Sequence, residues 1–269
     1  LQLTQEDVLA LFGVPPHWII CFVIYMLYAG GKLIIAPELA VGESLETIER
    51  EKATVLFALS SPYVEMSVMS ETEAKKYDLS SLRLCLIGFL SPDTRKGLKE
   101  RFGLDPISLY AMSETLSVIA APPLSGIRKP DSVGKPLSGW GLKIVDDEGR
   151  ELPPNQVGEI IITGPALMKG YYNRPQATAQ AIKDGWYYTG DMGKLDEEGF
   201  LFFAGRKKEM ITVAGQSILP IDIEEVLYTH PKVKEAAIVG VGGGERGGVI
   251  KAVIVLKEGE EATPDEIRR

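Results

Sequence analysis

The sequence predicts an α/β fold with a mostly parallel sheet, then a β-rich part, then a small, incomplete α+β C-terminal domain. Strand-like and helix-like segments alternate over residues 32–125, which is typical of a parallel sheet covered by helices. After Pro122-Pro123, strand-like segments alternate with turns, and from Gly205 a helical segment precedes two β-branched runs. A single core rarely grows beyond about 250–300 residues, so we expect several parts. The expected parts are residues 1–127, 128–206 and 207–269.

The apolar run from Trp18 to Ala29 predicts a buried helix. It lies within Val8–Gly31, a stretch without Asp, Glu, Lys or Arg, so a membrane span is the alternative. The uninterrupted apolar run has only 12 residues, whereas a transmembrane helix needs about 20. Pro15-Pro16-His17 interrupts the stretch and Gly30-Gly31 ends it. We therefore expect no membrane span.

The other elements of the first part follow from apolar runs and helix-end signals. Ser91 can cap a helix that has Pro92 at its first position and Gly103 at its end. A second helical segment covers Ser44–Lys52. The expected strands are Lys32–Ala36, Thr54–Leu59, Arg83–Ile87 and Ile107–Tyr110.

Turns and β-branched runs predict the remaining elements. The segment Asp196–Gly199 separates two strand segments, as in a hairpin. After Pro220, the apolar residues Ile223, Val226 and Leu227 recur at helical spacing. The other expected elements are strands Leu142–Val145, Glu159–Thr163, Met192–Leu195, Phe200–Phe203, Ala236–Val241 and Val249–Leu256, and a short helix Ala177–Lys183.

A glycine-rich string near the C-terminal end has two interpretations. Gly242-x-Gly244-x-x-Gly247 follows a strand and matches a dinucleotide-binding fingerprint. That fingerprint needs a helix N-terminus to receive the pyrophosphate, whereas Val249–Leu256 is apolar and β-branched. We therefore interpret the string as a hairpin turn.

The last residues predict the start of a helix. Thr263 can cap it, Pro264 suits the first helical position, and Glu266 stands three residues after the cap. Few residues follow these signals, so we expect the chain to be a fragment that is cut within the helix, and a frayed terminal turn is the alternative.

The composition argues against several classes of function. The 37 acidic and 29 basic residues give a net charge of −8, and such a surface repels nucleic-acid phosphates. Cys21 and Cys85 lie in apolar stretches, so we expect no disulfide and a cytoplasmic protein. Two cysteines and two distant histidines predict no structural zinc site. Gly215-Gln216-Ser217 lacks the second glycine of a nucleophile elbow, which leaves a serine hydrolase unsupported.

The segment Tyr110–Thr115 is the first candidate site. It follows a predicted parallel strand, where ligands bind in open α/β sheets. A tyrosine ring can stack on a base, hydroxyls can hold phosphate oxygens, and a glutamate can hold Mg²⁺. Taken alone, the segment is also compatible with an ordinary loop or helix cap.

Two further segments carry charged groups at turns between strands. In Tyr188-Thr189-Gly190-Asp191, a fixed carboxylate could accept two hydrogen bonds from vicinal ribose hydroxyls, and a plain turn is the alternative. The segment Gly205–Glu209 reads Gly-Arg-Lys-Lys-Glu. It is interpreted either as a solvated linker or as an arginine for ribose or phosphate beside a hinge.

In this order, the motifs resemble the adenylate-forming superfamily of acyl- and aryl-CoA synthetases, luciferases and peptide-synthetase adenylation domains. The motifs are Tyr110–Thr115, Gly170–Asn173, Gly185–Asp191 and Gly205–Glu209, and Val133–Lys257 resembles acyl-CoA synthetases almost continuously. The resemblance implies a ligase that uses ATP to convert a carboxylic acid, of the fatty-acid type, into acyl-AMP. The acyl group is then transferred to CoA.

The resemblance implies nucleotide-binding roles at five matching positions. Tyr110 would stack on adenine, Ser113 would contact phosphate, and Glu114 would bind Mg²⁺. Asp191 and Arg206 would hold the ribose. The implied small molecules are ATP or AMP, Mg²⁺, coenzyme A and a carboxylic acid, and a homodimer is a further expectation.

The resemblance gives five other positions roles in the hinge, the CoA route and the acyl pocket. Lys208 would be the hinge between a large and a small domain. Gly215 would line the route of the pantetheine arm of CoA. His17, Gly88 and Phe89 would border the acyl pocket, and an ordinary helix-start residue is the alternative for His17.

The chain also departs from the family pattern. Ala111 and Ser113 stand where members usually have glycine and threonine, and Phe89 adds bulk to the acyl-site loop. The phosphate loop would lie before Leu1, and a distal catalytic lysine would lie after Arg269. Two alternatives therefore stay open, namely an adenylation domain that loads a carrier protein and a non-catalytic nucleotide- or acyl-binding remnant.

Overall fold

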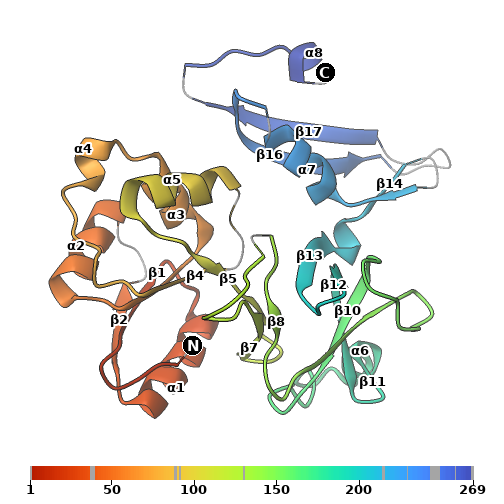
Figure 1. Ribbon diagram of the computed structural model, residues 1–269. Coiled ribbons are helices and arrows are strands. Elements are labelled where there is room, and N and C mark those ends of the chain that lie inside the picture. The colour runs from red at the N-terminus through yellow and green to blue at the C-terminus, as the bar shows by residue number, and fades with distance from the viewer. Residues whose placement is uncertain are drawn as a thin grey trace. The chain divides into compact units, whose positions relative to one another are not determined.

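The chain forms two compact units in a computed structural model (Figure 1). The model describes residues 2–36, 40–87, 90, 92–129, 131–213, 216–228, 230–242, 249–257 and 259–267. Unit 1 comprises Leu1–Gly141 and Thr163–Pro175, and unit 2 comprises Leu142–Ile162 and Gln176–Arg269. The predicted α/β class is confirmed, whereas the predicted domain boundaries after residues 127 and 206 stay predictions.

Unit 1 is built on a five-stranded sheet of parallel strands. The strand order is β2-β1-β3-β4-β5. The four predicted strands of this part are confirmed. The sequence does not predict β1, because its residues merge with the uncharged stretch that precedes the first helix. The strands are β1 (Val8–Phe12), β2 (Lys32–Ala36), β3 (Val55–Ala58), β4 (Leu84–Ile87) and β5 (Ile107–Ser108).

Helices cover both faces of this sheet (Figure 1). They are α1 (Pro16–Ala29), α2 (Val41–Glu51), α3 (Ser60–Val68), α4 (Glu71–Ala74) and α5 (Pro92–Phe102). Leu9 and Leu11 of β1 lie in a buried cluster with Phe22 of α1. Ala10 and Phe12 lie in a second cluster, with side chains of α2, α3 and α5. Because alternate residues point to opposite, covered faces, each strand is apolar throughout.

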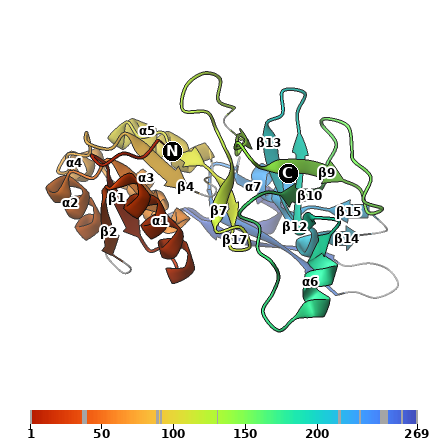
Figure 2. The ribbon, with the colours of Figure 1, turned by 90° about the horizontal axis from the view of Figure 1, so that it is seen from below.

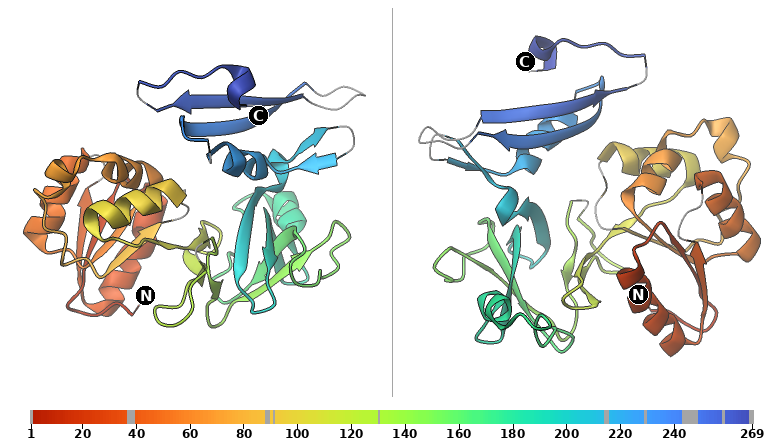
Figure 3. Two further views of the ribbon diagram at one scale, coloured as in Figure 1. Left: turned by 45° about the horizontal axis from the view of Figure 1, so that its top comes forward. Right: turned by 180° about the vertical axis from the view of Figure 1, so that it is seen from behind.

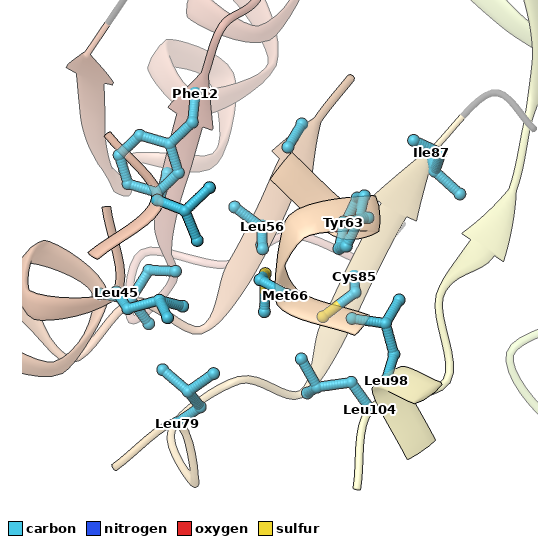
Figure 4. Close-up of a cluster of buried hydrophobic side chains, with 14 of the residues drawn as sticks. Phe12, Leu45, Leu56, Tyr63, Met66, Leu79, Cys85, Ile87, Leu98 and Leu104 are labelled. Atoms are coloured by element: carbon cyan, nitrogen blue, oxygen red, sulfur yellow. The ribbon is translucent and has the colours of Figure 1, made fainter. Parts of the chain in front are cut away.

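The second cluster shows how closely α3 and α5 pack (Figure 4). Tyr63 of α3 and Leu98 of α5 are fully buried, and the Tyr63 hydroxyl donates to the Leu86 carbonyl oxygen at 3.3 Å. A Cβ on Gly97 would lie 2.4 Å from the carbonyl oxygen of Ser67. Glycine at this position therefore permits the close approach of the two helices.

The predicted ends of α1 and α5 are both observed. Gly30, with φ +74°, ends α1, and its N–H donates to the Met26 carbonyl oxygen. Gly103, with φ +67°, follows α5, and its N–H donates to the Lys99 carbonyl oxygen at 3.0 Å. Left-handed backbone at these positions favours glycine. Ser91, the predicted cap of α5, lies outside the described residues.

The prediction that α1 is a buried helix is wrong for one of its faces. Phe22 and Met26 are 0% and 2% exposed, whereas Ile20, Leu27 and Tyr28 are 55%, 77% and 96% exposed. A helix that covers one face of a sheet buries only one of its sides, even when it is apolar all round. Among the helices that the structure describes, none has the length and apolar character that crossing a bilayer demands.

An ion pair between the buried Asp7 and the half-exposed Arg83 ties together the amino-terminal ends of β1, β3 and β4. Arg83 donates to both carboxylate oxygens of Asp7, at 2.8 Å each, and the Thr54 hydroxyl donates to Asp7 at 2.7 Å. Asp7 is 4% exposed. The hydrogen bonds from Arg83 and Thr54 hold the pKa of Asp7 well below its usual range, although burial opposes them. Ligands of open α/β sheets bind at the opposite, carboxyl end of the strands, so we assign this pair to stability.

Asp7→Asn is expected to lower the free energy of unfolding by about 1.5–3 kcal/mol at neutral pH, because Arg83 loses a charged acceptor. A lowered folded-state pKa stabilises the protein above the unfolded-state pKa, and this stabilisation is lost as pH falls through the folded-state pKa. Urea unfolding should therefore show the difference from the unaltered protein closing below about pH 4. The exposed control Asp105→Asn should change little. A difference that is independent of pH would contradict the ion-pair explanation.

A second sheet of unit 1 contacts α1. It consists of β6 (Tyr110–Met112), β7 (Ser117–Ala121) and β8 (Lys135–Pro136), with antiparallel pairing. The Tyr25 hydroxyl lies 3.2 Å from the Ser117 hydroxyl, and the Cys21 thiol donates to the Leu116 carbonyl oxygen at 3.1 Å. These contacts tie α1 to the start of β7, directly after the first candidate site.

Unit 2 contains a five-stranded sheet with order β11-β12-β10-β9, in which β13 also pairs with β12 (Figure 2). The β12–β13 pair is antiparallel and confirms the predicted hairpin around 196–199. Helix α6 (Pro175–Ala181) begins earlier than predicted and gives way to a short strand. The strands are β9 (Gly141–Val145), β10 (Gly158–Thr163), β11 (Ile182–Lys183), β12 (Trp186–Leu195) and β13 (Leu201–Arg206).

The rest of unit 2 is a small α+β arrangement, visible in blue in Figure 3. Its elements are η1 (Lys207–Glu209), a 3-10 helix, then β14 (Ile211–Val213), β15 (Gln216–Ile218), α7 (Pro220–Tyr228), β16 (Val233–Val241), β17 (Val249–Leu256) and α8 (Pro264–Ile267). Strands β16 and β17 are antiparallel, which confirms the predicted hairpin, although residues 243–248 of its turn lie outside the described ones. The Thr263 hydroxyl accepts from the Glu266 N–H at 3.3 Å, which confirms the predicted cap of the last helix.

Candidate functional site

The first candidate cluster lies in unit 1, directly after the parallel sheet. Tyr110 begins β6 two residues after β5 ends, and its side chain is 6% exposed. Ser113 and Glu114 stand in the turn between β6 and β7, where Ser113 is exposed and Glu114 is half-buried. The structure therefore places all three predicted residues on one strand and the turn that follows it.

Backbone and hydroxyl contacts hold this turn in one shape. The buried hydroxyl of Thr115 lies 2.9 Å from the carbonyl oxygens of both Met112 and Ser117. The Leu116 N–H donates to the Ser113 carbonyl oxygen at 3.2 Å, and Leu116 has a left-handed φ of +45°. The backbone that carries Ser113 and Glu114 is thus fixed from both sides.

Glu114 is also tied to the segment that closes unit 1. The Tyr171 hydroxyl donates to Oε1 of Glu114 at 3.0 Å, and the Met168 N–H donates to the Glu114 carbonyl oxygen at 2.8 Å. The sequence places Tyr171 in a family motif but assigns it no role. A tyrosine in a polar turn gives no signal that its hydroxyl reaches a carboxylate 57 residues earlier.

The Glu114 carboxylate could hold Mg²⁺ together with the phosphate oxygens of a bound nucleotide. In the part of the chain that the structure describes, no group of three or more His, Cys, Asp or Glu side chains could hold a metal ion. Mg²⁺ at nucleotide sites usually takes one or two carboxylates and fills its other positions with phosphate oxygens and water. One carboxylate with four lone-pair directions, one of them used by Tyr171, fits that arrangement.

The second candidate cluster lies in unit 2, where Asp191 and Arg206 meet across two strands. They face each other in the register of β12 and β13, and the Arg206 Nε lies 2.7 Å from Asp191 Oδ1. Asp191 is 2% exposed, whereas the Arg206 side chain is half exposed. The structure thus brings together the two residues predicted to hold the ribose, 15 positions apart in the sequence.

Asp191 stands in a bulge of β12. Glu159 of β10 faces Met192 and Ile161 faces Tyr188, so β12 has two more residues than β10 between these pairs. Gly190, with φ +71°, supplies the left-handed backbone that this excursion requires. Bulges commonly re-aim a side chain beside a functional site.

Two polar side chains satisfy the backbone of this bulge. The Thr189 hydroxyl donates to the Ile160 carbonyl oxygen at 2.7 Å and accepts from the Asp191 N–H at 3.0 Å. Glu159 Oε1 accepts from the Gly190 N–H at 3.1 Å. The sequence motifs give no role to Glu159, although a lone carboxylate in the apolar strand Gly158–Thr163 is a signal that could have identified it.

Lys207 completes this arrangement from the end of β13. Its Nζ lies 2.9 Å from Glu159 Oε2 and 2.9 Å from Asp147 Oδ1. The hydrogen bonds that Lys207 donates to these two carboxylates, the one to Glu159 first, raise the pKa of Lys207. The family resemblance gives the hinge role to Lys208 and no role to Lys207, so the sequence does not identify the anchored lysine.

The remaining predicted residues are less informative. Lys208 is exposed in η1, and its role as a hinge stays a prediction. Gly88, Phe89 and Gly215 lie outside the described residues. His17 lies in the first turn of α1, and its side chain is not among the described ones.

Two family models match the chain. The model for an AMP-binding enzyme matches residues 1–172, and the model for an AMP-binding enzyme C-terminal domain matches residues 222–269. The first match contains the first candidate cluster and more than half of the chain, whereas Asp191, Arg206 and Lys207 lie between the two matches.

Curated relatives with this similarity are CoA ligases. A long-chain-fatty-acid–CoA ligase of Bacillus subtilis is 37% identical over 90% of this chain and 44% of its own length. A 2-succinylbenzoate–CoA ligase of Geobacillus kaustophilus is 39% identical over 83% of this chain and 45% of its own length. The chain therefore spans about half the length of the curated relatives it matches.

Solved structures agree with the sequence relatives. ATP-bound MatB from Rhodopseudomonas palustris superimposes with a TM-score of 0.88 at 28% identity, over 99% of this chain and 53% of that one. The anthranilate CoA ligase AuaEII in complex with anthranoyl-AMP gives a TM-score of 0.87 at 28% identity, over 100% of this chain and 52% of that one.

Proposed function

Because the chain belongs to the AMP-binding enzyme family, within the adenylate-forming superfamily, we propose that it supplies about half of an acid–CoA ligase. Such a ligase activates a carboxylic acid with ATP to give acyl-AMP and pyrophosphate, and then transfers the acyl group to CoA. The observation that carries the proposal is the buried carboxylate of Asp191, fixed 2.7 Å from Arg206 Nε on a bulged strand. A fixed carboxylate of this kind suits a vicinal ribose diol.

We propose a fatty acid as the substrate. The fatty-acid ligase of Bacillus subtilis is similar over 90% of this chain, which supports this choice. Other relatives are ligases of indoleacetate and 2-succinylbenzoate, so the identity of the acid differs among the relatives. His17, Gly88 and Phe89 are the residues proposed to border its pocket.

In the first half-reaction, the substrate carboxylate attacks the α-phosphorus of ATP, and pyrophosphate leaves. Asp191 and Arg206 hold the ribose, Tyr110 contacts the adenine, and Ser113 donates to a phosphate oxygen. Glu114 would hold Mg²⁺, which when bound neutralises charge on the phosphates as pyrophosphate departs. The tie from Tyr171 keeps the Glu114 carboxylate in place before the nucleotide arrives.

In the second half-reaction, the CoA thiol attacks the acyl carbon and AMP leaves. We propose that residues 207–269 belong to a small domain that turns about Lys208 between the two steps. Gly215 would line the route of the pantetheine arm. We also propose a cytoplasmic location, which the two buried, free cysteines support.

Pyrophosphate exchange tests this function directly. A full-length protein that contains this chain should exchange labelled pyrophosphate into ATP in the presence of a fatty acid, and should form acyl-CoA only when CoA is added. Thioester formation on a carrier protein instead of CoA would favour a peptide-synthetase type of adenylation domain. Nucleotide binding without exchange for any acid would indicate a non-catalytic binding protein.

The 269-residue chain by itself is expected not to form acyl-CoA. It spans about half the length of its relatives, and the family's phosphate loop and distal lysine have no match in it. The measurement is acyl-CoA production by the purified chain beside an intact family member at equal concentration. Turnover within about tenfold of the intact enzyme would contradict this expectation.

A further inference from the structure

We propose that Glu159 and Lys207 form a clasp that positions Asp191 and Arg206 for the ribose. Glu159 is then a positioning residue, which acts through the bulge and does not touch the nucleotide. The inference rests on the proposed function, because that function assigns the ribose to Asp191 and Arg206. It adds two residues to which the sequence motifs give no role.

The first step of the argument is the backbone before Asp191. Gly190 has a left-handed conformation and lies where the regular pairing of β12 with β10 is interrupted. Its N–H donates to Glu159 Oε1 at 3.1 Å. An N–H that is partly shielded from water is costly to leave without a partner, so the carboxylate favours this shape of the bulge over a regular strand. The shape in turn aims the adjacent Asp191 side chain toward β13.

The second step is the charge of Glu159. Its side chain is 11% exposed, and burying a charged group is costly unless it is paired and hydrogen-bonded. Lys207 supplies the cation at 2.9 Å from Oε2, while Gly190 uses the other oxygen. Because both oxygens are occupied, movement of either partner disturbs the other.

The third step is the position of Lys207 directly after Arg206. Arg206 has an extended backbone, with φ −108° and ψ 135°, so neighbouring side chains diverge. One side chain therefore reaches Asp191 while the next reaches Glu159. The clasp therefore holds both residues that we assign to the ribose. It holds Asp191 through Gly190, the residue before it, and Arg206 through Lys207, the residue after it.

The experiment uses two ligands and the full-length protein. AMP carries both ribose hydroxyls, and 2′,3′-dideoxy-AMP lacks both. The unaltered protein should bind AMP about ten to a hundred times more tightly than the dideoxy compound. Glu159→Gln and Lys207→Met should each reduce that preference by about tenfold, while the affinity for the dideoxy compound changes less than about threefold.

The control is Lys143→Met. The Lys143 side chain is 40% exposed, like that of Lys207, and pairs with Glu151 at 2.8 Å in the same unit. It should keep the full preference for AMP. A purely structural role for Glu159 would weaken the binding of both ligands equally, so equal losses or an unchanged preference overturn the clasp. Melting curves of all variants identify any loss of folding.

Failure of the proposed function gives a different pattern. If the unaltered protein binds both nucleotides equally, then Asp191 does not hold the ribose, and both the function of the pair and the clasp are rejected. A second pattern rejects only the clasp. In that pattern Asp191→Ala loses the preference for AMP over the dideoxy compound, whereas Glu159→Gln keeps the preference of the unaltered protein.

Discussion

Asp191→Ala is expected to weaken the apparent affinity for ATP about ten- to a hundredfold in the adenylation half-reaction. A hydrogen bond to a charged group contributes about 1.5–3 kcal/mol, and each 1.4 kcal/mol is about a factor of ten in affinity. Asp191 is 2% exposed and is held against Arg206, so little reorganisation is needed to receive a diol. The measurement is the dependence of pyrophosphate exchange on ATP concentration.

Two further variants sharpen this test. Asp191→Asn keeps the shape of the side chain and removes its charge, so it should give a smaller loss than alanine. Glu148→Ala removes an exposed acid of the same unit, which pairs only at the surface with Arg150, and should leave ATP dependence unchanged. An apparent ATP affinity that is the same for Asp191→Ala and the unaltered protein would show that Asp191 is a turn residue only.

Lys208→Pro is expected to slow CoA-dependent thioester formation about a hundredfold. Pyrophosphate exchange should slow less. Lys208 lies inside the 3-10 helix η1, and proline at this position locks φ near about −65°. Proline also disfavours helical backbone at the residue before it, which is the anchored Lys207. A rotation that starts at Lys208 needs the torsions that proline removes, whereas nucleotide binding depends mostly on residues before it.

Lys208→Ala is the matched control, because it removes the same side chain but leaves the backbone free. It should slow thioester formation far less than proline does. Both half-reactions should be measured on one preparation. An equal fall in both would mean that Lys208 is not the hinge or that proline has damaged the fold, and a melting curve separates these two explanations.

Most elements of the fold follow from the sequence. The apolar runs of β2, β3, β4 and β5, the helix-end glycines Gly30 and Gly103, and the hairpin β16–β17 are all predicted and observed. These features depend on residues close together in the chain, whose spacing and backbone preferences are local properties. Strand β1 is missed because its apolar residues merge with those of α1, and periodicity does not separate short apolar strands from helices.

The exposed face of α1 shows a second limit. Its residues are apolar on all sides, so the sequence predicts burial on all sides, and the structure buries only the side that meets the sheet. Which side of a helix is covered depends on the elements that pack against it. Apolar periodicity gives no information on this when every side of the helix has the same character.

The candidate site divides in the same way. The sequence alone determined the motif positions of Tyr110, Ser113, Glu114, Asp191 and Arg206, because their chemical types and order are written in the chain. Only the tertiary structure decided which groups hold them, namely Tyr171 on Glu114, and Glu159 with Lys207 behind the bulge that carries Asp191. Glu159 and Lys207 are 48 residues apart, and their contact depends on strand register and on a bulge of β12. Register is set by pairing between strands, so the physical reason is that these contacts exist only once distant segments have packed together.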